Sequence, residues 1–471
     1  MLPKNLKYGS KLESAMAKST RVNIAPQNGT GPYSLADTIT INIPTRSNLV
    51  LVPSESYLKF SNTVTATATS SAFRWDSCGA HGLIQRIRIL HGSNLLEDID
   101  NYGLLAKMLM DIQLPTDSSY GKLNLMSGTR NDLVSVIKAV DENVSCIQVN
   151  SGESFRSTGG TSILNSMQPS AASTTRFSDT ITGHVSFTNT YCLNLISLVG
   201  SLCNLNYLPL FAMTSAPLRV EITLASSITS CLNTLVGGTI STSNVEYIGN
   251  FIELSDPAMA MIYDSLNGEP LQFVIPSYRN YQHNGFLSSG SVTQIAMPLP
   301  AKFSSVKSLF ITLRDKANTA TYYPFSSSHL GLTEYYFRVG SQIMPTKAVN
   351  SHCEMFCEVL KAIGSISDLN HQPSIERNSY TSAYAVANTY ASEINNATNI
   401  GSGSFYIGLD LENYSSADKS SIFAGYNSNT DDIYCTMTFG PQATSISARF
   451  DGFASFDCVL VFENNTAYVK F

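Results

Sequence analysis

The sequence predicts an all-β protein made of two similar β-sandwich units, each of roughly eight strands. The composition supports this fold class, because 23 Tyr, 22 Phe and 29 Gly accompany many Ser, Thr and Asn residues, whereas only 14% of residues are charged. Aromatic and β-branched residues favour strands, and Gly, Asn and Ser favour the turns between them. The length of 471 residues also fits two units, since large β domains run to about 200–250 residues each.

The first 34 residues differ from the rest of the chain. They carry a net charge of +4, whereas the whole chain carries −6. One interpretation is a mobile terminus, and the other is an arm that docks on a neighbouring subunit, a membrane surface or an acidic polymer. Glu13 is the only acid of this segment, and its five cations are Lys4, Lys7, Lys11, Lys18 and Arg21.

Strand patterns follow in quick succession after the basic segment. Residues 38–43 alternate with period two, and residues 49–52, 57–60 and 83–90 are further apolar runs that end at Pro or at a turn cluster. The period then changes to a helical stripe at Leu104, Leu105, Met108 and Leu109. We expect a long polar excursion over 114–176 and more strands from about 179 to 262.

A second series repeats this order. Strands are predicted at 271–275, 306–313 and 335–339, followed by a helical stripe at Met355, Phe356, Val359 and Leu360. A Ser/Asn-rich stretch at 365–404 comes next. Strands then continue from 405 to the last residue.

The repetition indicates an internal duplication. Arg88 and Arg338 lie 250 residues apart, the two Gly-Ser turns at Gly92 and Gly340 lie 248 apart, and the helical stripes begin 251 apart. Constant spacing of this kind is the signature of a repeated unit. We therefore predict an N-terminal arm at 1–34, a first unit at 35–265 and a second unit at 266–471.

The cysteine pattern indicates a chain made in a reducing compartment. Nine Cys is an odd number, and with no signal peptide apparent we expect free buried thiols. The uncharged run 185–218 is rejected as a membrane span because it contains several Asn and a Pro. Five glycosylation sequons are interpreted as chance products of the composition, at Asn28, Asn143, Asn396, Asn413 and Asn464.

A search for chemistry yields no catalytic, cofactor or metal site. The phosphate-binding loop, the Gly-x-Ser-x-Gly elbow and the His-Glu-x-x-His motif are all missing from the sequence. His352, Cys353 and Cys357 have the ligand types that zinc prefers, but we predict that they face the core from a helix.

Three other groups have structural interpretations too. Glu97, Asp98 and Asp100 could bind calcium, yet we expect them to surround the start of the following helix. Asp431 and Asp432 are predicted turn residues, and the lone Trp75 is a predicted core residue.

One region carries a family resemblance. Leu193 to Gly200 is followed by Tyr207-Leu208-Pro209-Leu210 and by the alternating strand Leu218-Arg219-Val220-Glu221-Ile222. This order resembles the late strands of the first jelly roll in double jelly-roll major capsid proteins. These proteins come from tailless icosahedral double-stranded DNA viruses: adenoviruses, virophages, Polinton-like viruses and the giant-virus lineage. Residues 244–248, leading to Asp256-Pro257, look like the strand that closes that first barrel.

The resemblance implies two tandem eight-stranded jelly rolls with short helices in the loops. It also implies a structural capsid protein, not an enzyme, that forms pseudo-hexagonal homotrimers tiling an icosahedral shell in the virion. Implied partners are further copies of the chain, penton and minor capsid proteins, and an inner membrane or the genome at the basic arm. The two polar insertions would form the top of the trimer, and the compact length implies modest surface towers.

Two other function classes stay open. A secreted or surface-displayed β-sandwich adhesin or glycan-binding protein would show a cleaved leader and glycans at Asn143 or Asn413. A β-rich hydrolase would bring three titratable groups together in one cleft. The acidic net charge of −6 argues against a protein coated with nucleic acid.

Overall fold

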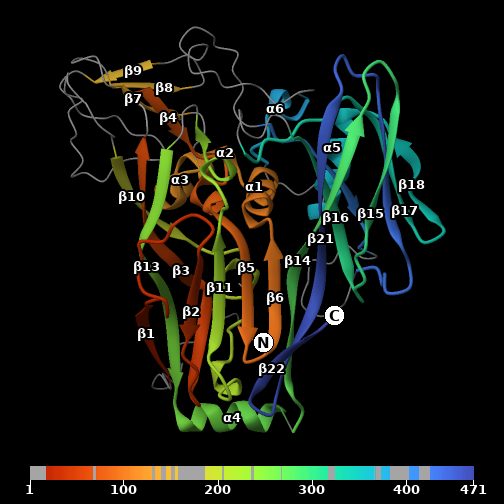
Figure 1. Cartoon of the computed structure of the whole chain (residues 1–471). Coiled ribbons are helices and arrows are strands. Elements are labelled where there is room, and N and C mark those ends of the chain that lie inside the picture. The colour runs from red at the N-terminus through yellow and green to blue at the C-terminus, as the bar shows by residue number, and fades with distance from the viewer. Residues whose placement is uncertain are drawn as a thin grey trace, which may run out of the picture.

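The computed structural model shows two β-sandwiches side by side (Figure 1). It describes residues 17–66, 70–129, 133–138, 145–149, 154–157, 186–203, 206–234, 238–266, 268–316, 324–364, 366, 373–381, 403–412 and 425–471. The predicted all-β class is confirmed.

The first unit is built from two four-stranded antiparallel sheets. Sheet A has the order β1-β13-β3-β10 and sheet B has the order β2-β11-β5-β6. The strands of sheet A are β1 (Ala17–Ile24), β13 (Gly238–Leu254), β3 (Leu49–Ala66) and β10 (Ser186–Leu193). Those of sheet B are β2 (Thr38–Ile43), β11 (Leu218–Leu224), β5 (Ile84–His91) and β6 (Asn94–Asp100).

The second unit has two sheets of the same kind. Sheet C has the order β14-β21-β16-β19, with β22 also paired to β21, and sheet D has the order β15-β20-β17-β18. The strands of sheet C are β14 (Leu271–Leu287), β21 (Ile446–Glu463), β16 (Val306–Asp315), β19 (Tyr406–Asp410) and β22 (Thr466–Lys470). Those of sheet D are β15 (Thr293–Leu299), β20 (Ile433–Phe439), β17 (Leu332–Val339) and β18 (Gln342–Val349).

The two units share one strand connectivity. When the eight main strands of each unit are counted along the chain, the first, eighth, third and sixth form one sheet in that order. The second, seventh, fourth and fifth form the other sheet in both units. This arrangement is the jelly roll, and its repetition confirms the predicted double jelly roll.

Both predicted helical stripes are helices, and each follows the fifth main strand of its unit. α1 (Tyr102–Gln113) and α5 (His352–Ile363) begin 250 residues apart. The hairpins before them turn at Gly92 and Gly340, each with φ of 58°, a left-handed conformation that glycine adopts without strain. The duplication seen in the sequence is therefore a duplication of local geometry.

The N-terminal segment differs from the prediction. Ala17–Ile24, expected to be part of the arm, instead forms edge strand β1 and pairs along its whole length with β13. Lys18 and Arg21 thus belong to a sheet, whereas Lys4, Lys7 and Lys11 lie outside the described residues.

The excursion expected at 114–176 contains regular structure in its described parts. A small sheet of order β12-β4-β7-β8-β9 lies at one end of the first unit, at the top in Figure 1. Its strands are β12 (Asn233–Thr234), β4 (Ser70–Arg74), β7 (Leu133–Lys138), β8 (Ser145–Val149) and β9 (Ser154–Ser157). Most of the stretch expected at 365–404 lies outside the described residues.

The remaining helical segments are short. The α-helices are α2 (Thr116–Tyr120), α3 (Lys122–Ser127), α4 (Asp256–Leu266) and α6 (Arg377–Thr381). The 3₁₀ segments are η2 (Gly79–Leu83), η3 (Ser201–Cys203), η4 (Leu210–Ala212) and η5 (Ile228–Ser230). None of the helices in the described part of the chain is long and apolar enough to cross a membrane.

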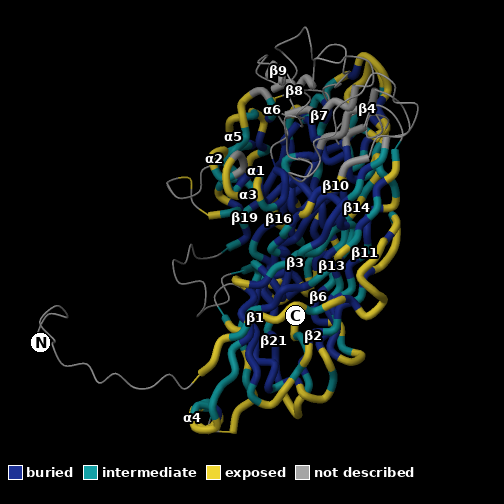
Figure 2. The backbone as a smooth tube through the Cα atoms, turned by 90° about the vertical axis from the view of Figure 1, so that its left-hand side faces the viewer, coloured by how far each residue is buried: buried dark blue, intermediate teal, exposed yellow. Residues whose placement is uncertain are grey.

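The core fills the space between the paired sheets and continues from one unit into the other (Figure 2). β2 and β11 alternate between buried and half-exposed residues, as expected for strands with one face on the core. β16 departs from this pattern, because all of its residues except Lys307 and Asp315 are buried. The outer face of sheet C must therefore be covered as well.

Candidate site at the junction between the two units

The junction between the units is built around a buried lysine of α1. The side chain of Lys107 is fully buried, and its Nζ donates to Asp111 and, at 3.0 Å, to Oγ of Ser404 in the second unit. Asp111 also accepts hydrogen bonds from the hydroxyls of Ser404 and Tyr406, both at 2.8 Å. One carboxylate thus joins α1 to β19 and the residues before it.

The charges of this cluster compensate one another. Burial lowers the pKa of Lys107, but Asp111 and Asp76 outweigh that effect and hold the pKa above its usual value. Burial, with Asp111 next to the hydroxyl, raises the pKa of Tyr406 well above its usual value. Lys107 therefore stays charged and Tyr406 neutral. Breaking a buried pair of this type costs about 3–5 kcal/mol, because one charge is left without compensation.

A second cluster surrounds Asp451 on the outer face of sheet C. Its carboxylate accepts from Arg314 Nε, from Arg449 Nε and from the side-chain amide of Asn101, each at 3.1 Å. Asn101 precedes α1 in the first unit, with φ of 54°. The start of α1 is thus fixed directly to the second unit.

Close packing adds to the polar contacts. Phe325 of the second unit lies against Gly82 and Gly103, and a Cβ atom added to Gly103 would lie 2.7 Å from the Phe325 ring. Any larger side chain at Gly103 would collide with this ring. The junction therefore requires a glycine in α1.

The C-terminal strand forms a further contact between the units. His91 at the end of β5 accepts from the Ala467 backbone N–H of β22 at 3.1 Å through Nδ1. Asn94 donates to the Ala467 carbonyl at 3.0 Å. Strand β22 thus lies against the β5–β6 hairpin of the other unit.

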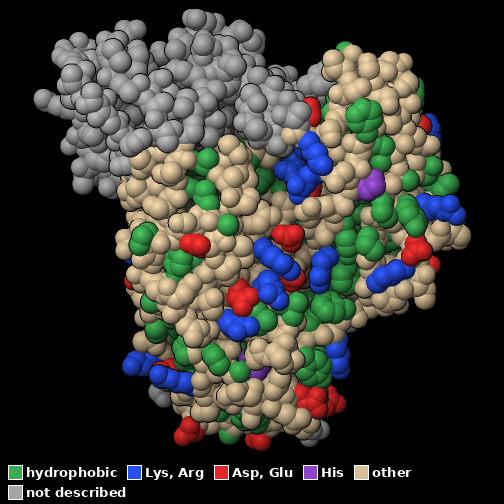
Figure 3. Space-filling view, viewed as in Figure 1, with side chains coloured by type: hydrophobic (Ala, Val, Ile, Leu, Met, Phe, Trp, Pro, Cys, Tyr) green, Lys and Arg blue, Asp and Glu red, His purple; other side chains and the backbone are tan. Residues whose placement is uncertain are grey.

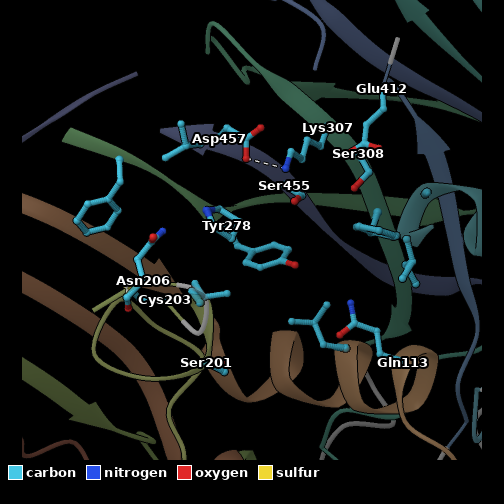
Figure 4. A pocket seen from close by; sticks show the side chains of 18 of the residues that line it. Gln113, Ser201, Cys203, Asn206, Tyr278, Lys307, Ser308, Glu412, Ser455 and Asp457 are labelled. Atoms are coloured by element: carbon cyan, nitrogen blue, oxygen red, sulfur yellow. Dashed lines mark hydrogen bonds and ion pairs between the residues drawn. The ribbon is translucent and has the colours of Figure 1, made fainter. Parts of the chain in front are cut away.

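A cavity of about 800 Å³ lies in the junction (Figure 4). Gln113 of α1, Ser201 and Cys203 line one side, and outward residues of sheet C such as Tyr278 and Ser455 line the other. An ion pair of 2.8 Å between Lys307 and Asp457 closes one wall. No histidine is among the residues that line it.

Glu97 is buried within β6, and the prediction that it surrounds a helix start is wrong. Its Oε2 accepts from the Leu198 N–H at 2.9 Å, and Oε1 has no hydrogen-bond partner among the described residues. Burial raises the pKa of Glu97 to about 8, the Leu198 N–H lowers it and Asp98 raises it. Asp98 instead pairs with Arg86 at 2.7 Å, so the acids of this strand do not converge.

The residues considered for zinc do not form a cluster. His352 packs on His329 with ring centroids 4.6 Å apart, and the predicted core position of Cys353 is wrong because this residue is exposed. Burial and the neighbouring His352 lower the pKa of His329 to about 4. Within the described ranges, no three His, Cys, Asp or Glu side chains lie close enough to hold a metal ion.

The other singled-out residues have structural roles. Trp75 is buried as predicted, and its Nε1 donates to the Tyr191 hydroxyl at 3.0 Å. Asp432 pairs with Lys302 at 2.8 Å, and Asp431 accepts from the Tyr426 hydroxyl.

The eight cysteines whose side chains the structure describes are free thiols. Five of them are buried as predicted, whereas Cys192 and Cys357 are half-buried. Burial raises the pKa of Cys203 and Cys231 to about 12, which leaves them protonated and unreactive. The five buried residues are Cys78, Cys203, Cys231, Cys435 and Cys458.

The outer faces of the sheets in the first unit differ in chemistry. The outer face of sheet B carries an ionic ladder in which Arg88 and Arg219 both pair with Glu221, at 3.3 and 3.1 Å. Figure 3 shows these charges gathered over β11, β5 and β6. The outer face of sheet A is instead rich in hydroxyls, with cross-strand pairs such as Thr63–Thr188 at 2.7 Å.

The junction residues were not anticipated from the sequence. Lys107 and Asp111 lie four residues apart inside an otherwise apolar helix, a spacing typical of an ion pair on one helix face. Charged residues in an apolar stripe are the signal that could have identified them.

Comparisons with known proteins add the fold family. No protein-family profile and no curated protein matches the sequence. Among solved structures, a chain of the PBCV-1 virus capsid is similar over 98% of this chain and 99% of its own length, with 10% identity and a TM-score of 0.61. A chain of the Sputnik virophage structure covers 100% and 92%, with 11% identity and a TM-score of 0.56. The mavirus major capsid protein covers 100% and 95%, with 12% identity and a TM-score of 0.54. The chain therefore has the double jelly-roll fold of the viral major capsid proteins to which it is similar.

Proposed function

We propose that this chain is a major capsid protein, and that three copies form a pseudo-hexagonal capsomer of an icosahedral shell. The observation that carries the proposal is the repetition of one jelly roll within a single rigid chain. Three copies of a two-unit chain present six similar units around a threefold axis. A closed ring of this type needs two complementary patches on each copy, and two units side by side supply them.

The junction suits this role because it fixes the angle between the units. Lys107, Asp111 and Asp451 are all buried and satisfied across it. A buried ionic network tolerates little displacement, since a small opening separates the paired charges while they are still shielded from water. The two units thus act as one building block.

We further propose a division at 265/266, with 35–265 and 266–471 as the two jelly rolls and β1 added to the first. Lys4, Lys7 and Lys11 then form the basic part of an N-terminal arm that faces the interior of the shell. Penton and minor capsid proteins, and an inner membrane or the genome at this arm, are the further partners we propose.

A structural role is favoured over a catalytic one by how the titratable groups are used. The acids and bases of the junction pair with one another, and Lys307 and Asp457 in the cavity wall do the same. None of these groups is left to act on a substrate. No observation favours the adhesin alternative.

The test is the mass of the purified protein in solution, measured by light scattering. We expect a mass of three chains and, in negative-stain images, particles with a hexagonal outline. A single-chain mass at micromolar concentration would contradict the proposal, because obligate interfaces of about 2,000 Å² or more do not dissociate at that concentration.

A further inference from the structure

We propose that the N-terminal segment, residues 1–16, docks on the outward face of helix α4 of the same chain. Helix α4 connects the last strand of the first unit, β13, to the first strand of the second unit, β14, and lies at the lower end of the molecule in Figure 1. The segment and the helix face carry opposite charges, and both also carry apolar side chains. This contact lies within one chain and does not depend on the proposed trimer.

The outward face of α4 is both apolar and acidic. Its inward face packs on the core through Met259, which is buried. On the outward side, Met261 and Tyr263 are 66% and 54% exposed. Asp256 and Asp264 lie about two helical turns apart on this side, and both are exposed. Large apolar side chains exposed together on one short helix are typical of an interaction surface.

The acids around α4 lack cationic partners. Asp256, Asp264 and Glu269 are exposed, and their carboxylates take part in no ion pair or hydrogen bond with any residue that the structure describes. By contrast, Asp98 and Glu221 on the outer face of sheet B both pair with arginines. Three uncompensated negative charges around one short helix attract a cationic segment.

Residues 1–16 have the complementary composition. Their side chains carry a net charge of +2, from three lysines and one glutamate. Three leucines lie close to these lysines in the sequence. The lysines are Lys4, Lys7 and Lys11, and the leucines are Leu2, Leu6 and Leu12. Such a segment can place cations beside the acids of α4 and apolar side chains on Met261 and Tyr263.

The segment also begins its path beside α4. Ala17, the first residue of β1, lies opposite Leu254 of β13, two positions before α4 begins at Asp256. Sixteen residues reach about 50 Å when extended, whereas α4 is about 16 Å long. The short tether gives the segment an effective concentration at this helix in the mM range. Docking within the chain is therefore favoured over docking on another copy.

The charges also decide between possible occupants of α4. An anionic lipid surface or a nucleic acid would be repelled by the acids of this helix. Docking occupies the three lysines, so an anionic membrane or genome that binds the arm, as proposed above, has to displace it from α4. This consequence rests on the proposed function, whereas the contact itself does not.

Carbodiimide cross-linking tests the contact. This reagent joins a lysine amine to a carboxylate at ion-pair distance as an amide, and it takes up the released water to become a urea. In the single-chain band of a denaturing gel, we expect peptides in which a lysine of residues 1–16 is joined to Asp256, Asp264 or Glu269. Such peptides found only in a two-chain band would overturn docking within the chain. Links spread evenly over surface carboxylates, or no link to these three acids, would overturn the contact itself.

Trypsin provides a second measurement, since it cleaves after Lys11 faster when the segment is released. Asp256→Asn combined with Asp264→Asn should speed this cleavage about fivefold, as expected for the loss of exposed ion pairs. The matched control is Asp117→Asn with Glu354→Gln, which removes two exposed acids from α2 and α5, far from α4 (Figure 1). We expect the control to cleave at the parent rate, and both variants to keep the parent melting temperature. Equal cleavage rates in the parent and the α4 variant would overturn the docking.

Discussion

At the scale of single residues, Glu97 couples the stability of the fold to pH. Burial is the main reason that its pKa is raised from 4.5 to about 8. The folded state therefore binds a proton that the unfolded state releases between these two values. Below pH 4.5 the carboxyl is protonated in both states and does not reduce the free energy of unfolding. As the pH rises toward about 8, the free energy of unfolding falls by up to ~5 kcal/mol.

We predict that Glu97→Gln removes this dependence. The amide can still accept from the Leu198 N–H but cannot ionise. The variant should match the parent protein near pH 5 and exceed its stability by a few kcal/mol at pH 9. Chemical denaturation across this range measures the effect, with the exposed Glu354→Gln as control. Equal pH slopes for Glu97→Gln and the parent would disprove the role of this carboxyl.

At the scale of elements, the two equivalent helices begin in different ways. Ser351 caps α5 in the ordinary manner, since its side chain accepts from the Glu354 N–H. Asn101 makes no such cap, adopts a left-handed backbone and donates to Asp451 instead. The residue before the helix thus caps the helix in the second unit, whereas in the first unit it binds the other unit across the junction.

This difference predicts different costs of substitution. Asn101→Ala should lose about 2–3 kcal/mol, because it combines backbone strain with a hydrogen bond lost from a buried carboxylate. Asn101→Gly relieves the strain and should lose less. Ser351→Ala should lose about 1 kcal/mol. Denaturation midpoints measure all three, and an equal loss for Asn101→Ala and Asn101→Gly would show that the left-handed backbone is not strained.

The sequence predicts those elements whose signals lie in neighbouring residues and misses those that depend on distant contacts. α1, α5 and their preceding turns were predicted because apolar spacing and Gly positions are local signals. β1 was missed, since its side chains are mostly exposed and its pairing with β13 joins residues more than 200 positions apart, such as Arg21 and Asn250. Glu97 was misplaced for a similar reason: its burial depends on Leu198 in a distant loop.

At the scale of the whole molecule, the junction should make the two units unfold together. Gly103→Val tests this coupling, because the added atoms would collide with Phe325 across the junction and with the Gly82 backbone, whose Cα lies 3.1 Å from the added Cβ. Overpacking of this kind costs about 1–3 kcal/mol. The Gly82 collision strains the first unit, and the closer Phe325 collision weakens the contact between the units. We therefore expect one calorimetric transition to separate into two, with the first unit unfolding earlier. Gly440→Ala is the control, since its Cβ would meet only ordinary contacts with Thr333 at 3.5 Å and the Gly331 carbonyl at 3.6 Å. A single sharp transition in Gly103→Val, shifted or not, would mean that the jelly rolls are coupled through the rest of the shared core and do not depend on the α1 contact.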